Sequence, residues 1–282
     1  MAQWARALPE VAIEPDGSLR VDHDAPTEAP EAVFDCQAHG GLLAFLDEAA
    51  SRDDPAGRIK VQLVGPLTLG LALCEAGLPV ADAFRRSGEA VRAWASAIEA
   101  LVARRLPGAA LLLVLDEPGL VVWRSGDGPL ERECAVDLLS AALAVPACVT
   151  GVHVCGRGDR RIALEAGPDL LAVEVRNDLV DDAAVIGRHL DADGWVAWGA
   201  VPTDRPVGES SEPLWRVLAG VWCELTRHGC DPVRVRTQGL VTPACGLAGH
   251  GPTQAERALR LAVELADRVH DQAVAARLTL GA

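Results

Sequence analysis

The feature that most constrains this sequence is a change of pattern near Gly40. From there onward, apolar runs of strand length alternate with amphipathic segments of helix length. Parallel strands buried on both faces read as nearly continuous apolar runs, so this alternation predicts βα units around a parallel sheet. The expected strands are Ile59–Val64, Ala110–Leu115, Val149–Val154, Leu170–Val175, Val196–Val201 and Val235–Val241, and the expected helices cover residues 81–105, 130–143, 159–166, 181–190, 213–228 and 254–274.

Six βα units predict an α/β protein with a TIM-barrel-like (β/α)₈ fold. A closed barrel needs eight strands in roughly 250 residues, so two strands must come from residues 1–58, come from a partner, or be absent. The barrel is therefore either completed by one of these sources or incomplete at its N-terminus. We expect one domain overall, with residues 59–282 as the barrel and residues 1–58 as an extension that holds a helix and a hairpin of Val11–Glu14 with Leu19–Asp22.

Composition excludes several classes of partner. The 282 residues include 26 basic and 40 acidic side chains, which gives a net charge of −14. A nucleic-acid partner is not expected, because binding phosphates requires a basic face. The longest uncharged stretches, 61–74 and 138–152, fall short of the about 20 apolar residues of a membrane span, so no membrane partner is expected either. The first residues do not resemble a secretory signal, which favours a cytoplasmic location.

Reactive side chains stand at the ends of the expected strands, where parallel barrels place their active sites. His153 and Cys155 are two residues apart and point to the same side of one strand. Glu174 stands in an apolar strand, where burying a carboxylate is costly unless it is paired or bound to metal. Taken alone, His153, Cys155 and Cys245, the last at a later strand end, are each more often ordinary core residues, whereas Glu174 is not. Together they offer the nitrogen, sulfur and oxygen donors of a zinc site.

Two carboxylates stand at the end of another expected strand. Asp116 and Glu117 are followed by Pro118, which stops the strand at the expected catalytic face. We expect catalytic roles for both, with an ion-paired strand end as the alternative. Arg160 and Arg161 are interpreted instead as a solvated helix face.

Five short motifs occur in a fixed order: Gly65-Pro66-Leu67-Thr68, Asp116-Glu117-Pro118, His153-Val154-Cys155, Glu174 and Pro243-Ala244-Cys245-Gly246-Leu247. Over about residues 59–275 this order resembles the catalytic barrel of cobalamin-independent methionine synthase and its short relatives, within a wider group that includes uroporphyrinogen decarboxylase. The resemblance implies a zinc-dependent methyltransferase of methionine biosynthesis, with His153, Cys155, Glu174 and Cys245 holding the ion. It also implies that Asp116 binds the amino group of a thiol such as homocysteine, and that the substrate sulfur displaces Glu174.

The predicted reaction transfers a methyl or small alkyl group to a small-molecule thiol. Zinc suits this reaction because only the thiolate is a competent nucleophile and coordination deprotonates the thiol. By the resemblance, the donor is methyltetrahydrofolate or a methylcobalamin-carrying corrinoid protein. The sequence contains no second barrel, and Asp204 stands nearest to where full-length relatives have a histidine that protonates the folate. These two features favour the corrinoid donor.

Two alternatives stay open. The chain could be a partial or non-catalytic barrel subunit whose strand edges pair with a second copy or another protein, since exposed edges invite pairing. It could also be a uroporphyrinogen-decarboxylase-like enzyme or a thiol lyase on the same barrel.

Overall fold

The computed structural model describes residues 1–52, 57–145 and 147–280, with side chains as far as residue 274. It confirms the predicted α/β fold, with β3 to β8 following one another in one sheet in chain order. In the described residues this sheet has six strands, two fewer than a closed (β/α)₈ barrel. The strands are β3 (Arg58–Val64), β4 (Ala110–Asp116), β5 (Cys148–Val154), β6 (Leu170–Glu174), β7 (Trp195–Val201) and β8 (Gly239–Pro243).

The chain divides into two compact units, Met1–Val152 and His153–Ala282. In the first unit, β1 (Val11–Ile13) and β2 (Leu19–Val21) pair antiparallel as the expected hairpin. This hairpin is a sheet of its own, so the described residues 1–52 add no strand to the six-stranded sheet.

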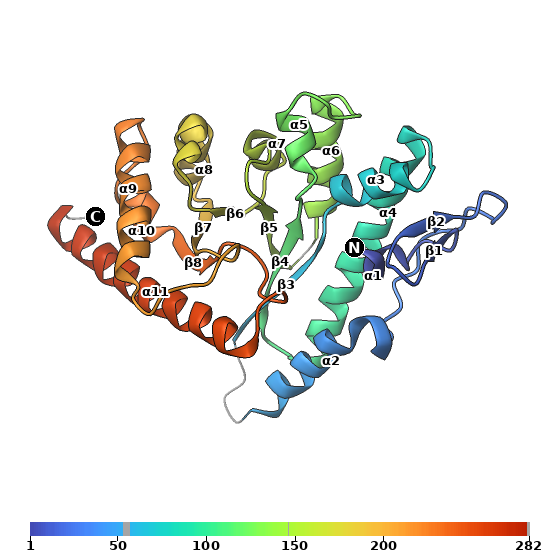
Figure 1. Ribbon diagram of the computed structural model, residues 1–282, viewed down its shortest axis with the longest axis horizontal. Helices are drawn as coiled ribbons and strands as arrows, with labels where there is room; N and C mark the ends of the chain where they lie inside the picture. The colour runs from blue at the N-terminus through green and yellow to red at the C-terminus, as the bar shows by residue number, and fades with distance from the viewer. Residues whose placement is uncertain (53–56, 146, 281–282) are drawn as a thin grey trace. The chain divides into compact units, whose positions relative to one another are not determined.

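The N-terminal segment packs instead against the long helix α4 (Val80–Arg105) (Figure 1). Trp94 of this helix donates a hydrogen bond from Nε1 to the carbonyl of Trp4, at 2.7 Å. Arg86, also on α4, binds both carboxylate oxygens of the buried Glu10, at 2.6 and 2.8 Å. A bidentate pair of this kind fixes orientation as well as position, so it anchors the hairpin region to α4.

Strands β3 and β4 pair in parallel along their whole lengths in this unit. In the chain, β3 is followed directly by α3 (Pro66–Glu75), which the hydrophobic pattern did not predict. Most of its residues are buried, so it has no polar face to give a helical period. The other helices of the unit are α1 (Ala2–Ala5), α2 (Cys36–Ser51), α5 (Leu120–Arg124) and α6 (Arg132–Leu143).

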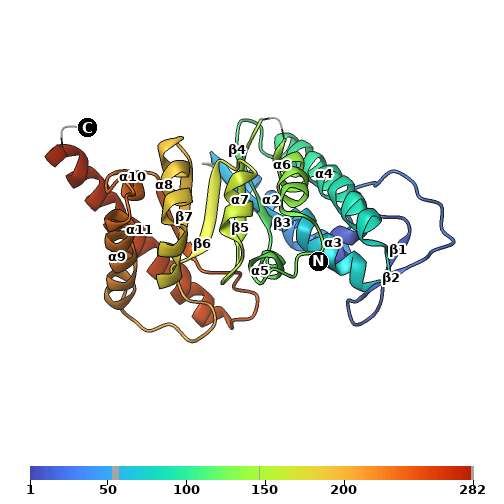
Figure 2. The ribbon, with the colours of Figure 1, turned by 90° about the horizontal axis from the view of Figure 1, so that it is seen from above.

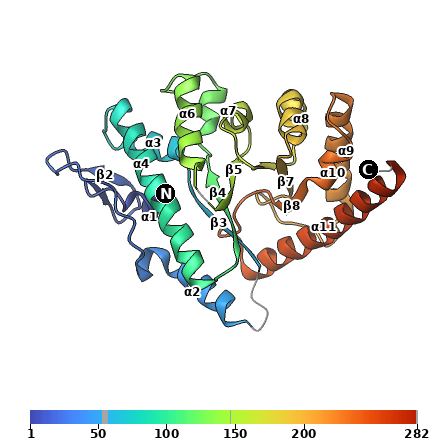
Figure 3. The same cartoon turned by 180° about the vertical axis from the view of Figure 1, so that it is seen from behind.

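In the second unit, β6 pairs with β7 and β7 with β8, all in parallel. The last helix, α11 (Pro252–Leu280), packs along β8 and β7 (Figures 2 and 3). The prediction of a strand over Val235–Val241 was wrong at its start, because residues 234–237 form a short helix that buries Val235. The helices are α7 (Arg160–Glu165), η1 (Asn177–Asp182), α8 (Ala183–Asp191), α9 (Glu212–Arg227), α10 (Arg234–Thr237) and α11 (Pro252–Leu280).

A membrane-spanning helix was not expected. Among the described residues, none of the helices is both long enough and apolar enough to cross a bilayer.

Candidate metal centre

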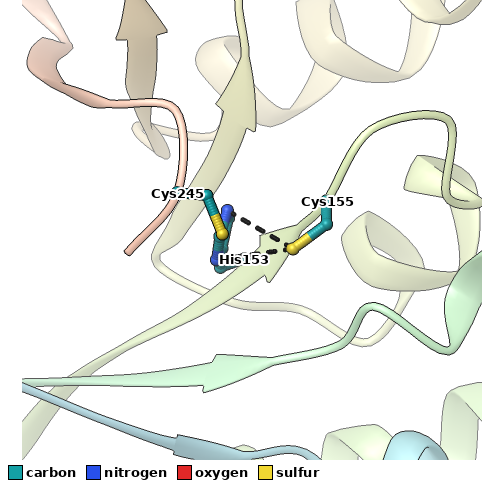
Figure 4. Close-up of side chains that lie close together, drawn as sticks. All are labelled: His153, Cys155 and Cys245. Atoms are coloured by element: carbon teal, nitrogen blue, oxygen red, sulfur yellow. Dashed lines mark hydrogen bonds between the residues drawn. The ribbon is translucent and has the colours of Figure 1, made fainter. Parts of the chain in front are cut away.

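The carboxyl end of β5 supplies the first two residues of the centre. His153 lies in the strand and is 7% exposed, while Cys155 directly follows it and is half-buried. The Cys155 Sγ lies 3.8 Å from Nε2 and 4.0 Å from Nδ1 of His153 (Figure 4). Gly156 then turns the chain with a φ of +52°, a left-handed conformation that glycine adopts without a steric penalty.

The segment after β8 brings in the third residue. Ala244 donates its N–H to the carbonyl of Val201, at 2.8 Å, and so crosses the end of β7. This crossing needs a glycine in β7, because a Cβ on Gly199 would lie 2.8 Å from the Ala244 Cα. Cys245 is the next residue in the chain, and its thiol points toward the His153 ring (Figure 4).

A hydrogen bond fixes the orientation of the histidine ring. Nε2 of His153 lies 3.2 Å from the carbonyl oxygen of Ala244. A carbonyl can only accept, so in this hydrogen bond Nε2 is the donor. Metal-ligating histidines commonly donate their other ring N–H to a backbone carbonyl in this way.

The donor atoms of His153, Cys155 and Cys245 all lie within 4.8 Å of one another. Around a tetrahedral zinc ion, Zn–S and Zn–N distances place neighbouring donors about 3.6 to 3.8 Å apart. The three side chains therefore need to approach by no more than about 1 Å to share one ion. Two thiols and an imidazole are also the donor types that zinc prefers, so these residues fit the metal that the sequence predicted.

The fourth predicted ligand does not belong to this group of three. Glu174 is the last residue of β6, and its Oε2 accepts a hydrogen bond from Nη1 of Arg176, at 3.3 Å. Its backbone is nevertheless close to the centre. The Cα atoms of Glu174 and Ala244 lie 3.2 and 2.8 Å from one point beside Gly199, and hence within about 6 Å of each other. Coordination by Glu174 stays a prediction.

Arg160 anchors the chain next to the centre. It is fully buried, so interpreting it as part of a solvated helix face was wrong, whereas Arg161 is indeed exposed. Arg160 binds Asp182 at 2.9 Å and Asp178 at 3.0 Å, and it donates to the carbonyl of Gly156 at 3.2 Å. The last contact holds the turn that follows Cys155. The sequence analysis did not predict this network, whose acidic partners Asp178 and Asp182 lie 18 and 22 residues after Arg160 in the chain.

Two other polar side chains of the C-terminal unit, those of His250 and Asp204, have local partners. His250 lies with Nε2 3.1 Å from the carbonyl of Thr203, which ties its loop to the end of β7. Asp204, which the sequence resemblance predicted to stand nearest to a folate-protonating histidine of full-length methionine synthases, is exposed and pairs with Arg205.

The predicted catalytic carboxylates Asp116 and Glu117 belong to the N-terminal unit. Asp116 ends β4 and accepts a hydrogen bond from Nε2 of Gln62, at 2.6 Å. Glu117 is completely buried and accepts three hydrogen bonds at the start of α3: from the backbone N–H groups of Leu67 and Thr68, at 2.8 and 2.7 Å, and from the Thr68 hydroxyl at 2.6 Å. This geometry makes Glu117 an anchor for α3. The catalytic roles of both residues stay predictions.

Burial raises the pKa of Glu117 from 4.5 to about 7, even though its three donors favour the charged form. Between these two values the folded chain keeps a proton that the unfolded chain has lost, so this group makes folding less favourable as the pH rises. We expect the free energy of unfolding of the wild type to fall relative to Glu117→Gln, by up to about 3 kcal/mol between pH 4.5 and 7. Urea unfolding of both proteins across this range measures the difference. Parallel pH profiles would contradict the assignment.

Comparison with known proteins gives a fold relationship. Neither the models of protein families nor the curated protein sequences give a match. Among solved structures, the chain is similar to a B12-independent methionine synthase from Shewanella sp. W3-18-1, solved in complex with selenomethionine. The similarity has a TM-score of 0.62 at 14% identity and covers 98% of this chain and 80% of the other. At this identity it shows a shared fold. The chain therefore has the α/β fold of a methionine synthase and a cluster of three side chains suited to zinc.

Proposed function

We propose that the chain is a zinc-dependent transferase that moves a methyl or small alkyl group to a thiol such as homocysteine. The observation that carries this proposal is the convergence of His153, Cys155 and Cys245, whose donor atoms lie within 4.8 Å of one another. The fold similarity to a methionine synthase supports the same reading.

The three side chains would all be ligands of the zinc ion. Cys155 and Cys245 would hold zinc as thiolates, and His153 would bind through the nitrogen that does not donate to Ala244. Two thiolates and a neutral imidazole balance the charge of the ion, so an added substrate thiolate would give the centre a net negative charge, which favours a nucleophilic sulfur. Bound zinc supplies the positive charge that lowers the pKa of a substrate thiol. In the transfer, the substrate sulfur would form a bond to the methyl carbon, the bond from methyl to its donor would break with its electron pair left on the donor, and the thiol proton would pass to solvent.

The test is methyl transfer by purified, zinc-loaded protein. Homocysteine is supplied with either methylcobalamin or methyltetrahydrofolate, and methionine is measured by mass spectrometry. We expect methionine with at least one donor, loss of the product after zinc is removed with a chelator, and recovery when zinc is returned. Cys245→Ser should lose the product. Its matched control is Cys223→Ser, because Cys223 is an exposed cysteine on α9. A folded, zinc-loaded protein that forms no methionine with either donor would refute the proposal.

A second candidate is a barrel subunit completed by a partner. The observation that favours it is the strand count, since β3 and β8 are the ends of the six-stranded sheet in the described residues. Failure of methyl transfer by a zinc-loaded protein, together with a size-exclusion profile larger than one chain, would favour this candidate.

A further inference from the structure

Glu174 lies outside the cluster of three, but its backbone approaches that cluster. The Glu174 backbone lies beside the segment that carries Cys245, as the close approaches around Gly199 show. Its carboxylate is about one quarter exposed and is engaged by Arg176. The backbone of Glu174 is therefore near the segment that carries Cys245, while its carboxylate is paired with Arg176.

Arg176 is itself held in place by Asp178. Its Nε donates to Asp178 at 3.0 Å, and Asp178 also accepts from the fully buried Arg160 at 3.0 Å. The contact of Arg176 with Glu174 is longer, at 3.3 Å, and both side chains are partly exposed. Since exposed ion pairs contribute little free energy, this last contact is the one that can break while the rest of the network stays intact.

We infer that Arg176 competes with the metal ion for the carboxylate of Glu174, so that Glu174 alternates between an ion pair with Arg176 and a place in the coordination sphere. This inference rests on the metal centre of the proposed function. With Glu174 on Arg176, the centre has three protein ligands and one position for an incoming thiol. Arg176 then is a positioning residue that receives the carboxylate whenever the thiol takes that position.

The test measures zinc affinity by competition with a chromophoric chelator, without thiol or methyl donor. Arg176→Met frees the carboxylate, and because a partly exposed ion pair is worth at most about 1 kcal/mol, we expect zinc to bind more tightly, by up to about fivefold. Glu174→Gln is expected to bind zinc less tightly than the wild type. The double variant is expected to match Glu174→Gln, because Arg176 acts through that carboxylate. Arg161→Met removes a nearby exposed arginine that pairs with Asp182, and it should leave the affinity unchanged.

Two results would overturn the inference. Zinc affinity in Arg176→Met could equal or fall below that of the wild type, or the gain could persist in the Glu174→Gln background, which would indicate a general charge effect. Cobalt substitution gives a second readout, since the visible spectrum of the cobalt-loaded protein should shift in Arg176→Met as an oxygen ligand enters. Absence of methyl transfer would refute the proposed function without changing these affinities, whereas a wild type that binds no zinc would refute both.

Discussion

Replacing Cys245 with serine is expected to reduce bound zinc from nearly one ion per chain to background in protein purified without added metal. Cys245 is one of two cysteines in the group of three donors, and serine offers a poor ligand at the same place. Mutating even the hydrogen-bond partners of metal ligands costs about 10- to 100-fold in affinity, so loss of a thiolate should cost more than about 100-fold. Elemental analysis of the purified protein gives the zinc content, and chelator competition gives the affinity.

The matched control for this variant is again Cys223→Ser, which should keep the zinc content of the wild type. Circular dichroism would show that both variants are folded. A wild type that is folded and free of zinc, or a Cys245→Ser protein with full zinc, would contradict the metal centre. If Cys245→Ser loses zinc and Cys223→Ser does not, the segment after β8 is part of the site.

Arg160→Met is expected to lower the free energy of unfolding by about 3–5 kcal/mol, the usual cost of breaking a buried ion pair by removing one partner. Arg160 is fully buried, and Asp182, which it contacts at 2.9 Å, is 2% exposed. Methionine fills a similar volume, so the loss would come from the uncompensated carboxylates and not from a cavity. Urea unfolding at pH 7 measures this difference.

Arg161→Met provides the comparison within the same helix. Arg161 also contacts Asp182, at 3.3 Å, but its side chain is 56% exposed. Exposed pairs contribute between 0 and about 1 kcal/mol, so this variant should remain close to the wild type. Equal destabilisation by the two variants would show that the burial of Arg160 has no energetic importance.

The sheet strands were predictable because each is buried on both faces and therefore reads as a continuous apolar run. This signal placed five of the six strands within one residue of their observed ends. It failed for α3, whose residues are mostly buried, because a helix without a polar face has no period to detect. It also failed for Val235, which is buried in the short helix α10 and continues the apolar pattern of β8.

The sequence by itself determined which residue types stand at the strand ends, since strand length and alternation place His153, Cys155 and Glu174 there. Only the tertiary structure decided which of them meet. Cys245 reaches His153 because the chain crosses β7 over Gly199, a contact between segments far apart in the sequence. Likewise, the engagement of Glu174 by Arg176 depends on a side-chain conformation, and the burial of Arg160 depends on partners in η1. Local patterns encode local structure, whereas these contacts depend on how distant segments pack.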